Sequence, residues 1–228
     1  MSDKTNASRR DFLKGSTAVA ASVAVASQIG IARTAHAAGS DVIKAALIGC
    51  GGRGNGAIED SMNADPGIRV IAVADAFEDR VQGTARRLRE KRADRVDLPD
   101  DRVFSGLDAF EKAIAAGADL IITATPPGFR PMVYAAAIAA GKHVFMEKPC
   151  CVDAAGYRKL MEANQMAEDK GLKVGVGFQR RHQPEYIETI KRIHDGAIGD
   201  IKLLRAYWNG GGIWNRPRKE GATEMQYQ

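Results

Sequence analysis

Short apolar runs alternate with helical patterns from residue 43 to residue 176, and this alternation constrains the fold more than any other sequence feature. Continuous apolar runs of this length indicate strands that are buried on both faces of a parallel sheet. The predicted strands are 43–49, 68–74, 103–104, 119–125, 143–147 and 173–176, and the predicted helices are 55–63, 78–93, 107–116, 131–140 and 153–170. We therefore expect an α/β fold, a Rossmann doubly wound parallel sheet.

The rhythm changes after Gly177. A helix is predicted from Pro184, with isoleucines three residues apart at 187, 190 and 193. A strand is predicted over 200–208, where apolar and charged residues alternate as in an antiparallel sheet with one solvent-exposed face. One helix and one strand do not complete a domain. We expect the start of a second domain of α+β type, incomplete at Gln228.

The N-terminus has the pattern of an export signal. Residues 8–14, SRRDFLK, resemble the twin-arginine consensus and precede an apolar stretch that polar residues interrupt. A membrane-spanning helix needs about 20 strongly apolar residues, so we expect no permanent membrane span. Ala35-His36-Ala37 fits signal peptidase, which predicts a twin-arginine signal peptide over 1–37 and a mature chain from Ala38. An N-terminal amphipathic anchor is the alternative.

This route carries proteins that are already folded, commonly because a cofactor is loaded first. We therefore expect the twin-arginine translocation machinery as a partner, a periplasmic or exported protein, and a bound cofactor.

The charge is close to balanced. Lys and Arg number 33 against 28 Asp and Glu, and residues 1–37 contribute +3 of the formal +5. No concentrated basic face is left for nucleic acid, which we exclude as a partner.

Three cysteines, one of them at position 50 and two adjacent at 150 and 151, do not make a disulfide framework. We expect buried thiols and no metal site.

Residues 49–54, GCGGRG, form a G-x-G-x-x-G pattern between a buried strand and a helix, which is the setting of a dinucleotide-binding loop. Gly49 permits the tight turn, Gly51 lets the backbone approach a pyrophosphate, and Gly54 lets the helix pack on the strand. The helix N-terminus, with Gly52 and Arg53, then faces the anion. By itself the pattern is a weak signal, since a glycine-rich loop can simply be a turn.

Asp75 makes the nucleotide interpretation stronger, because it ends the second strand, 26 residues after Gly49. A carboxylate there accepts hydrogen bonds from the ribose hydroxyls and repels a 2′-phosphate, so NAD is favoured. Arg53 and Arg80 are close enough in sequence to reach a 2′-phosphate, so NADP stays possible. We predict an NAD(P)-binding Rossmann domain over 38–150, with its last elements and part of a second domain over 151–228.

Three motifs together resemble one family. They are GCGGRG, Ala124-Thr125-Pro126-Pro127 and GKHVFMEKP at 141–149, and residues 174–201 add a further similar tract. On these motifs residues 43–208 resemble the Gfo/Idh/MocA oxidoreductases, named for glucose-fructose oxidoreductase and inositol 2-dehydrogenase. Exported members with twin-arginine signals are especially similar.

The resemblance implies roles for the residues at the end of the fifth predicted strand, 143–147. Lys148 would be catalytic, placed beside the nicotinamide to relay a proton, and burial next to a cation would lower its pKa. An ordinary surface lysine is the alternative. Glu147 would hydrogen-bond the cofactor or orient Lys148, while Thr125 and Pro126 would line the pyrophosphate and the nicotinamide ribose.

Residues 179–182 follow the last strand and would face the cleft between domains. The resemblance assigns Gln179 to the cofactor, and Arg181 and His182 are the substrate candidates, although His182 could equally cap the helix that follows. Residues 214–217 resemble a loop over the substrate side in similar proteins.

The resemblance implies that residues 151–228 hold, after the last Rossmann elements, part of an α+β substrate and oligomerisation domain with an open antiparallel sheet. Similar proteins continue beyond this length and supply an acid/base histidine further along. We therefore expect a C-terminally truncated chain, whether a fragment, a split gene or a frameshifted product, and a homo-oligomer only in a full-length form.

The predicted activity is that of an NAD-dependent oxidoreductase acting on CH–OH groups, with hydride transfer between nicotinamide and a sugar, cyclitol or related polyol. The alternatives are an NAD-dependent, redox-neutral glycosidase of the same family and a nucleotide-binding remnant without turnover.

Overall fold

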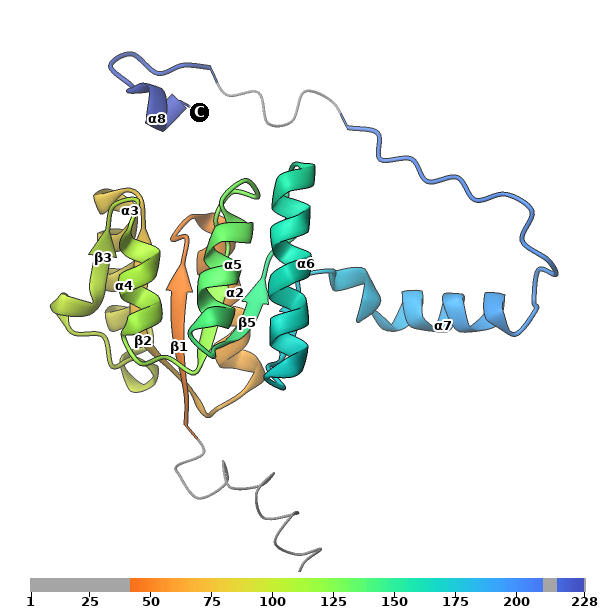
Figure 1. Cartoon of the computed structure of the whole chain (residues 1–228), viewed down its shortest axis with the longest axis horizontal. Coiled ribbons are helices and arrows are strands. Elements are labelled where there is room, and N and C mark those ends of the chain that lie inside the picture. The colour runs from red at the N-terminus through yellow and green to blue at the C-terminus, as the bar shows by residue number, and fades with distance from the viewer. Residues whose placement is uncertain (1–41, 211–216, 228) are drawn as a thin grey trace, which may run out of the picture. The chain divides into compact units, whose positions relative to one another are not determined.

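The computed structural model describes residues 42–210 and 217–227, and its main feature is a six-stranded sheet between helices (Figure 1). The strands are β1 Ile43–Ile48, β2 Ile68–Asp75, β3 Val103–Ser105, β4 Leu120–Thr123, β5 His143–Met146 and β6 Val174–Val176. Every neighbouring pair is parallel, and the strand order is β3-β2-β1-β4-β5-β6. This is the doubly wound Rossmann order, which confirms the predicted fold class.

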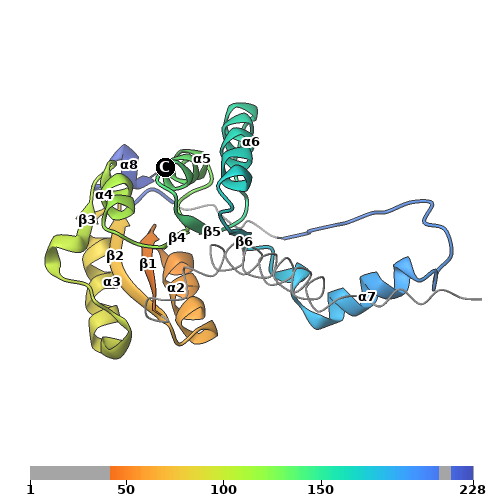
Figure 2. The same ribbon diagram turned by 60° about the horizontal axis from the view of Figure 1, so that its bottom comes forward.

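Helices cover both faces of the sheet, and Figure 2 shows the resulting three layers. They are α2 Gly52–Ala64 and α3 Glu78–Lys91 on one face, and α4 Ala109–Ala115, α5 Arg130–Ala139 and α6 Ala154–Asp169 on the other. A strand covered on both sides needs apolar residues at consecutive positions. Residues 45–48 of β1 accordingly have exposed fractions of 2% or less.

The order of the strands reverses at β1, so that β2 and β3 lie on one side of it and β4 to β6 on the other. Loops that follow β1 and β4 therefore leave the same edge in opposite directions and open a crevice. The Gly49 N–H donates to the Ala74 carbonyl at 2.8 Å, and the Ala124 N–H donates to the Ile48 carbonyl at 2.9 Å. The first bond ties the start of the β1 loop to β2, and the second holds the start of the β4 loop beside the end of β1.

Several predicted helix ends are confirmed. Gly141 and Gly171 have φ values of +73° and +67°, which suit a glycine that closes a helix. Asp153 caps α6 by accepting from the Gly156 N–H at 2.6 Å. Helix α2 begins three residues earlier than predicted, at Gly52, because its glycine-rich first turn has low helix propensity and hides the start.

The compact unit that contains the sheet extends to Phe178. Helix α6 and strand β6, expected as the last Rossmann elements, complete the sheet. Two short 3₁₀ helices, η2 Ala93–Arg95 and η3 Asp100–Arg102, lie between α3 and β3.

Residues from Gln179 onward form a second unit, with η4 Gln179–Arg181, α7 Pro184–His194 and α8 Glu224–Tyr227. Gly196 and Gly199, which follow α7, have positive φ values of +86° and +68°. The strand predicted over 200–208 is wrong: residues 201–210 have no regular structure. Within the described ranges no strand pairs with this segment, and an extended segment needs a partner for its backbone groups.

The predicted signal peptide, residues 1–37, and residues 214–216 of the predicted loop lie outside the described residues. Among the helices of residues 42–210 and 217–227, none is long and apolar enough to cross a membrane.

Candidate functional site

The glycine-rich loop after β1 packs closely against the start of the loop after β4. Gly49 has φ +97°, and a Cβ on it would lie 2.8 Å from backbone atoms of Ala124 and Thr125. A Cβ on Gly54 would lie 1.8 Å from the Gly49 carbonyl oxygen. Both positions exclude any side chain, so the tight turn predicted at Gly49 and the close helix packing predicted at Gly54 are confirmed.

The middle of the loop is open. A Cβ on Gly51 or Gly52 would meet nothing within 4 Å among the described atoms. Helix α2 starts at Gly52, and the first N–H groups of a helix have no partner inside the helix. Free N–H donors beside an open surface form a cradle that an anion can occupy.

Asp75 lies directly beside this loop, at the end of β2. Its carboxylate accepts from the Cys50 N–H at 2.7 Å and from the Phe77 N–H at 3.0 Å. The side chain is largely buried, with 9% exposed. A carboxylate has four lone-pair sites, and two hydrogen bonds leave acceptor capacity on both oxygens. Asp75 therefore orders the loop and retains acceptors for a further donor.

Cys50 inside the loop is a buried, inert thiol. Its Sγ lies 3.5 Å from the Ala74 carbonyl oxygen. Burial, reinforced by the negative charge of Asp75, raises the pKa of the thiol to about 12. A thiolate is the reactive form of cysteine, so Cys50 acts in this loop as a small apolar residue, as predicted. The prediction of buried thiols is wrong for Cys150 and Cys151, which lie after β5 and are only half-buried.

Glu147, at the end of β5, binds the arginine of the glycine-rich loop. The Arg53 Nε lies 2.7 Å from Glu147 Oε1, and this hydrogen bond raises the pKa of Arg53. The carboxylate is 7% exposed and fills space beside Gly177, where a Cβ would lie 2.8 Å from its oxygens. The pair links helix α2 to strand β5 across the crevice.

A second arginine, Arg130, supports the same strand end. It is 5% exposed, and one Nη1 donates to the Pro149 carbonyl. Burial lowers the pKa of Arg130, and the negative charge of Glu147 opposes that shift. The residues Glu147 to Pro149 are thus held by charged groups from α2 and α5.

The two arginines considered for a 2′-phosphate lie on different sides of the site. Arg53 is bound to Glu147, which directly follows β5. In the sheet β5 lies three strands away from β2, about 14 Å at the usual strand spacing. Arg80 lies in the first turn of α3, five residues after Asp75, with its guanidinium 4.8 Å from the Phe77 ring centroid. Only Arg80 stays on the Asp75 side.

Lys148, Thr125 and Pro126 lie at the same carboxyl edge of the sheet, after β5 and β4. Lys148 and Pro126 are exposed and Thr125 is half-buried, with its Oγ1 3.3 Å from that of Thr123. We expected the Lys148 side chain to be buried. Among the described residues of the first unit nothing covers it, and it is exposed.

Gln179, Arg181 and His182 belong to the second unit. Gln179 and Arg181 lie in η4, and the His182 N–H donates to the Gln179 carbonyl at 3.0 Å. All three are exposed. Their neighbour Arg180 bonds to the Tyr186 hydroxyl at 2.7 Å and lies over the Trp208 ring at 5.1 Å.

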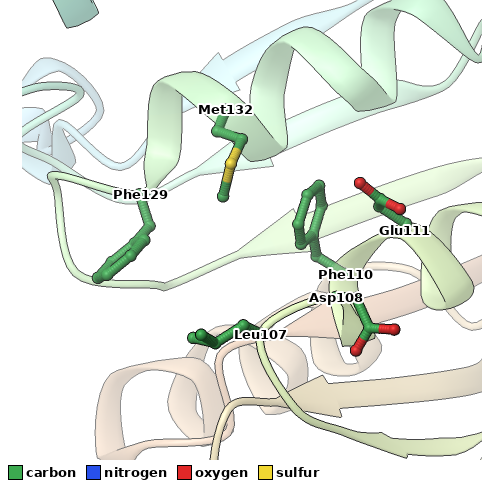
Figure 3. A pocket seen from close by; sticks show the side chains of 6 residues that line it. All are labelled: Leu107, Asp108, Phe110, Glu111, Phe129 and Met132. Carbon is green, nitrogen blue, oxygen red and sulfur yellow. The ribbon is translucent and has the colours of Figure 1, made fainter. Parts of the chain in front are cut away.

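A shallow apolar pocket of about 360 Å³ lies beside α4 and α5. Figure 3 shows Phe129 and Met132 facing Leu107 and Phe110 across it. The predicted cofactor and catalytic residues are not among those that line it. No group of three or more His, Cys, Asp or Glu side chains in the described part of the chain has the arrangement of a metal site.

Two residues near the site carry no sequence signal. Thr84 on α3 donates to the Cys50 carbonyl at 3.3 Å, and Arg130 binds the turn after Glu147. Neither belongs to a motif, and a lone threonine or arginine inside a helix has no pattern that would identify its contacts.

Comparisons with known proteins agree with this geometry. Residues 43–178 match a family model described as an oxidoreductase family with an NAD-binding Rossmann fold, and residues 6–26 match the twin-arginine translocation signal sequence. The matched domain covers more than half of the chain and includes the glycine-rich loop, Asp75 and Lys148.

Curated relatives include inositol 2-dehydrogenase 1 of Saccharopolyspora erythraea, 29% identical over 71% of this chain and 44% of that protein. Another is the inositol 2-dehydrogenase/D-chiro-inositol 3-dehydrogenase of Halalkalibacterium halodurans, 31% identical over 70% of this chain and 42% of that protein. The chain thus spans less than half the length of these relatives. A solved scyllo-inositol dehydrogenase from Lactobacillus casei, with bound NAD(H) and scyllo-inositol, has a TM-score of 0.55 at 22% identity over 70% of this chain and 43% of its own.

Proposed function

Because the chain belongs to the Gfo/Idh/MocA family of oxidoreductases with an NAD-binding Rossmann fold, we propose that it acts in hydride transfer to or from a CH–OH group of a sugar, cyclitol or related polyol. One observation carries the proposal most: the glycine-rich loop presents free N–H donors and no side chains at Gly51 and Gly52, beside the Asp75 carboxylate. The inositol dehydrogenases among the relatives support the polyol class.

The residues of the loop fit a dinucleotide. The open surface at Gly51 and Gly52 and the start of α2 suit a diphosphate, and the spare lone pairs of Asp75 suit ribose hydroxyls. The position of Asp75 favours NAD, and Arg80 is the residue that would admit NADP. Bound NAD supplies the site that accepts or returns hydride at C4 of the nicotinamide.

The chain's own residues then hold and protonate the reacting groups. Lys148, on a turn anchored by Glu147 and Pro149, would exchange a proton with the substrate oxygen through its Nζ. Thr125 and Pro126 would line the cofactor, and Gln179 would contact it. Arg181 and His182 are proposed to bind the substrate.

We also propose a place of action. The twin-arginine signal sequence matched at residues 6–26 supports export of a folded, cofactor-loaded protein to the periplasm.

The first experiment is a titration of the full chain with NADH, followed by nucleotide fluorescence. We expect saturable binding, and an Asp75→Ala variant with affinity lower by roughly tenfold, since it loses acceptors for donors in the site. Asp79→Ala, an exposed carboxylate on the first turn of α3, is the matched control and should bind as the parent chain does. A folded chain without NADH affinity would refute the cofactor site and every role built on it.

A second experiment tests turnover and Lys148. Incubation with NAD and myo- or scyllo-inositol should release NADH, and Lys148→Ala should bind NADH normally while losing that reaction. NADH binding without reaction on any polyol would leave the binding site standing and refute the proposed chemistry. Sugar release from a glycoside with no net NADH would refute it in favour of a redox-neutral glycosidase.

A further inference from the structure

A polar cluster lies behind the glycine-rich loop, on the side of helix α3. Its members are Asn55 on α2 and Thr84 and Arg87 on α3. Asn55 Nδ2 lies 3.1 Å and Thr84 Oγ1 lies 3.3 Å from the Cys50 carbonyl oxygen. Thr84 is 2% exposed, so its hydroxyl is shielded from water and stays near this oxygen. Asn55 Nδ2 therefore donates to this carbonyl, and Thr84 shares its single hydroxyl hydrogen between the carbonyl and Asn55 Oδ1.

Arg87 decides which way the Asn55 amide faces. Arg87 Nη2 donates to Asn55 Oδ1 at 2.6 Å, and the Thr84 hydroxyl lies 2.9 Å from the same oxygen. A flipped amide would place its NH₂ group against the guanidinium, donor against donor. The charge of Arg87 therefore keeps Nδ2 directed at the Cys50 carbonyl. Arg87 is itself held by Glu59, 3.1 Å from its Nη1.

The position of this carbonyl fixes the next N–H group. The peptide that joins Cys50 to Gly51 is planar, and in a trans peptide the C=O and N–H point in opposite directions. With the carbonyl drawn back toward α3, the Gly51 N–H faces away from α3. A Cβ on Gly51 would meet nothing within 4 Å, and the Gly51 N–H has no acceptor within residues 42–210 and 217–227. The preceding N–H, on Cys50, is already bound by Asp75.

We propose that Asn55, Thr84 and Arg87 are positioning residues for nucleotide binding, which aim the Gly51 N–H at the diphosphate without touching it. This inference rests on the proposed function, because it takes the glycine-rich loop as the NAD site. A loop whose carbonyl is fixed in advance loses less conformational entropy when the anion binds.

Two neutral variants test the cluster. Thr84→Val keeps the shape and removes the hydroxyl, and Asn55→Leu removes the amide while Arg87 keeps Glu59. The matched controls are Thr189→Val, which removes an exposed hydroxyl that bonds the Glu185 carbonyl, and Asn63→Leu. Asn63 also lies on α2 and accepts from Arg92, an arginine that likewise retains Glu59.

The probes are NADH, ADP and adenosine, titrated against the full chain. In each variant we expect the Kd for NADH and for ADP to rise about 3- to 10-fold, because the loss of one hydrogen bond usually weakens binding by about that factor. Adenosine has no phosphate, so its affinity should not change. The controls should match the parent chain for all three probes, and circular dichroism should show that every variant is folded.

Failure of the positioning role can be told apart from failure of the proposed NAD site. If the parent chain binds none of the probes, the proposed NAD site itself is refuted. If the parent chain binds NADH and both cluster variants bind it equally well, the positioning role is refuted. Equal weakening of adenosine and ADP would also refute it, because the cluster would then act on the fold rather than on the Gly51 N–H.

Discussion

The two units of the chain differ in what their apolar side chains contact. In the first unit, residues 42–178, the sheet and five helices bury two clusters of apolar residues, one on each face. In the second unit, α7 exposes Tyr186, Ile187 and Ile190 by 42% to 54%, and none of its described residues is buried. Each buried Val, Leu or Ile contributes about 1.5 to 3 kcal/mol. The stability of the described chain therefore resides in the first unit, which also carries the glycine-rich loop.

The comparison teaches where a functional residue can be held accurately. Asp75 and Glu147 stand at strand ends with bonds to groups that are themselves fixed by buried elements. Arg181 and His182 stand on an exposed 3₁₀ segment and a residue beside it. Three experiments, from the largest expected effect to the smallest, test this difference between the units.

The largest effect is expected at Gly54. Gly54→Ala places a Cβ 1.8 Å from the Gly49 carbonyl oxygen, so that helix α2 has to move off strand β1. Overpacking against backbone should cost about 3 kcal/mol or more of unfolding free energy, and NADH binding should be lost. Urea denaturation followed by circular dichroism measures the first effect and nucleotide fluorescence the second.

Gly83→Ala is the matched control, a glycine inside helix α3 where a Cβ would meet nothing within 4 Å. This variant should be more stable by up to about 1 kcal/mol, since alanine favours helix. If Gly54→Ala behaves like Gly83→Ala, the close packing of α2 on the loop is wrong.

An intermediate effect is expected at Cys50, because burial raises the pKa of its thiol from the ordinary value of 9.0 to about 12. Below the lower value both the folded and the unfolded chain carry the neutral thiol, and stability does not depend on this group. As the pH rises from 9.0 toward 12, the unfolded chain loses the proton while the folded chain keeps it. Stability should therefore fall in this window, and Cys50→Ala should lose less of it.

Thiol labelling gives a second measurement of the same residue. At about pH 8, iodoacetamide should modify the half-buried Cys150 and Cys151 and leave Cys50 unmodified until urea unfolds the chain. Mass spectrometry of the peptides locates the label. Native labelling of Cys50 as fast as that of Cys151 would mean that the interior of the first unit opens.

Features that depend on the backbone could be predicted from the sequence. The turn at Gly49, the packing at Gly54 and the place of Asp75 follow from a local spacing of residues, and a local spacing determines local geometry. The six parallel strands follow from apolar runs that need cover on both faces. These features need no knowledge of which distant residue is close in space.

Features that depend on distant partners could not be predicted. Glu147 binds Arg53, 94 residues earlier, and no periodicity relates the two positions. Thr84 reaches the Cys50 carbonyl from another helix. The strand predicted over 200–208 has the right alternation, yet a strand forms only with a neighbour that accepts and donates its hydrogen bonds.

The smallest effect is expected in the second unit, and it measures the difference between the units directly. Ile122 on β4 is 0% exposed and Ile190 on α7 is 49% exposed. Ile122→Ala should cost about 2 to 5 kcal/mol, because it leaves a cavity in the sheet. Ile190→Ala removes the same atoms from a surface and should change the unfolding free energy by less than about 0.5 kcal/mol. Urea denaturation of the two variants gives both values, and Ile187→Ala serves as a repeat of the surface substitution. A cost at Ile190 that approaches the cost at Ile122 would mean that the apolar face of α7 is covered in solution, and the contrast drawn between the two units would then fail.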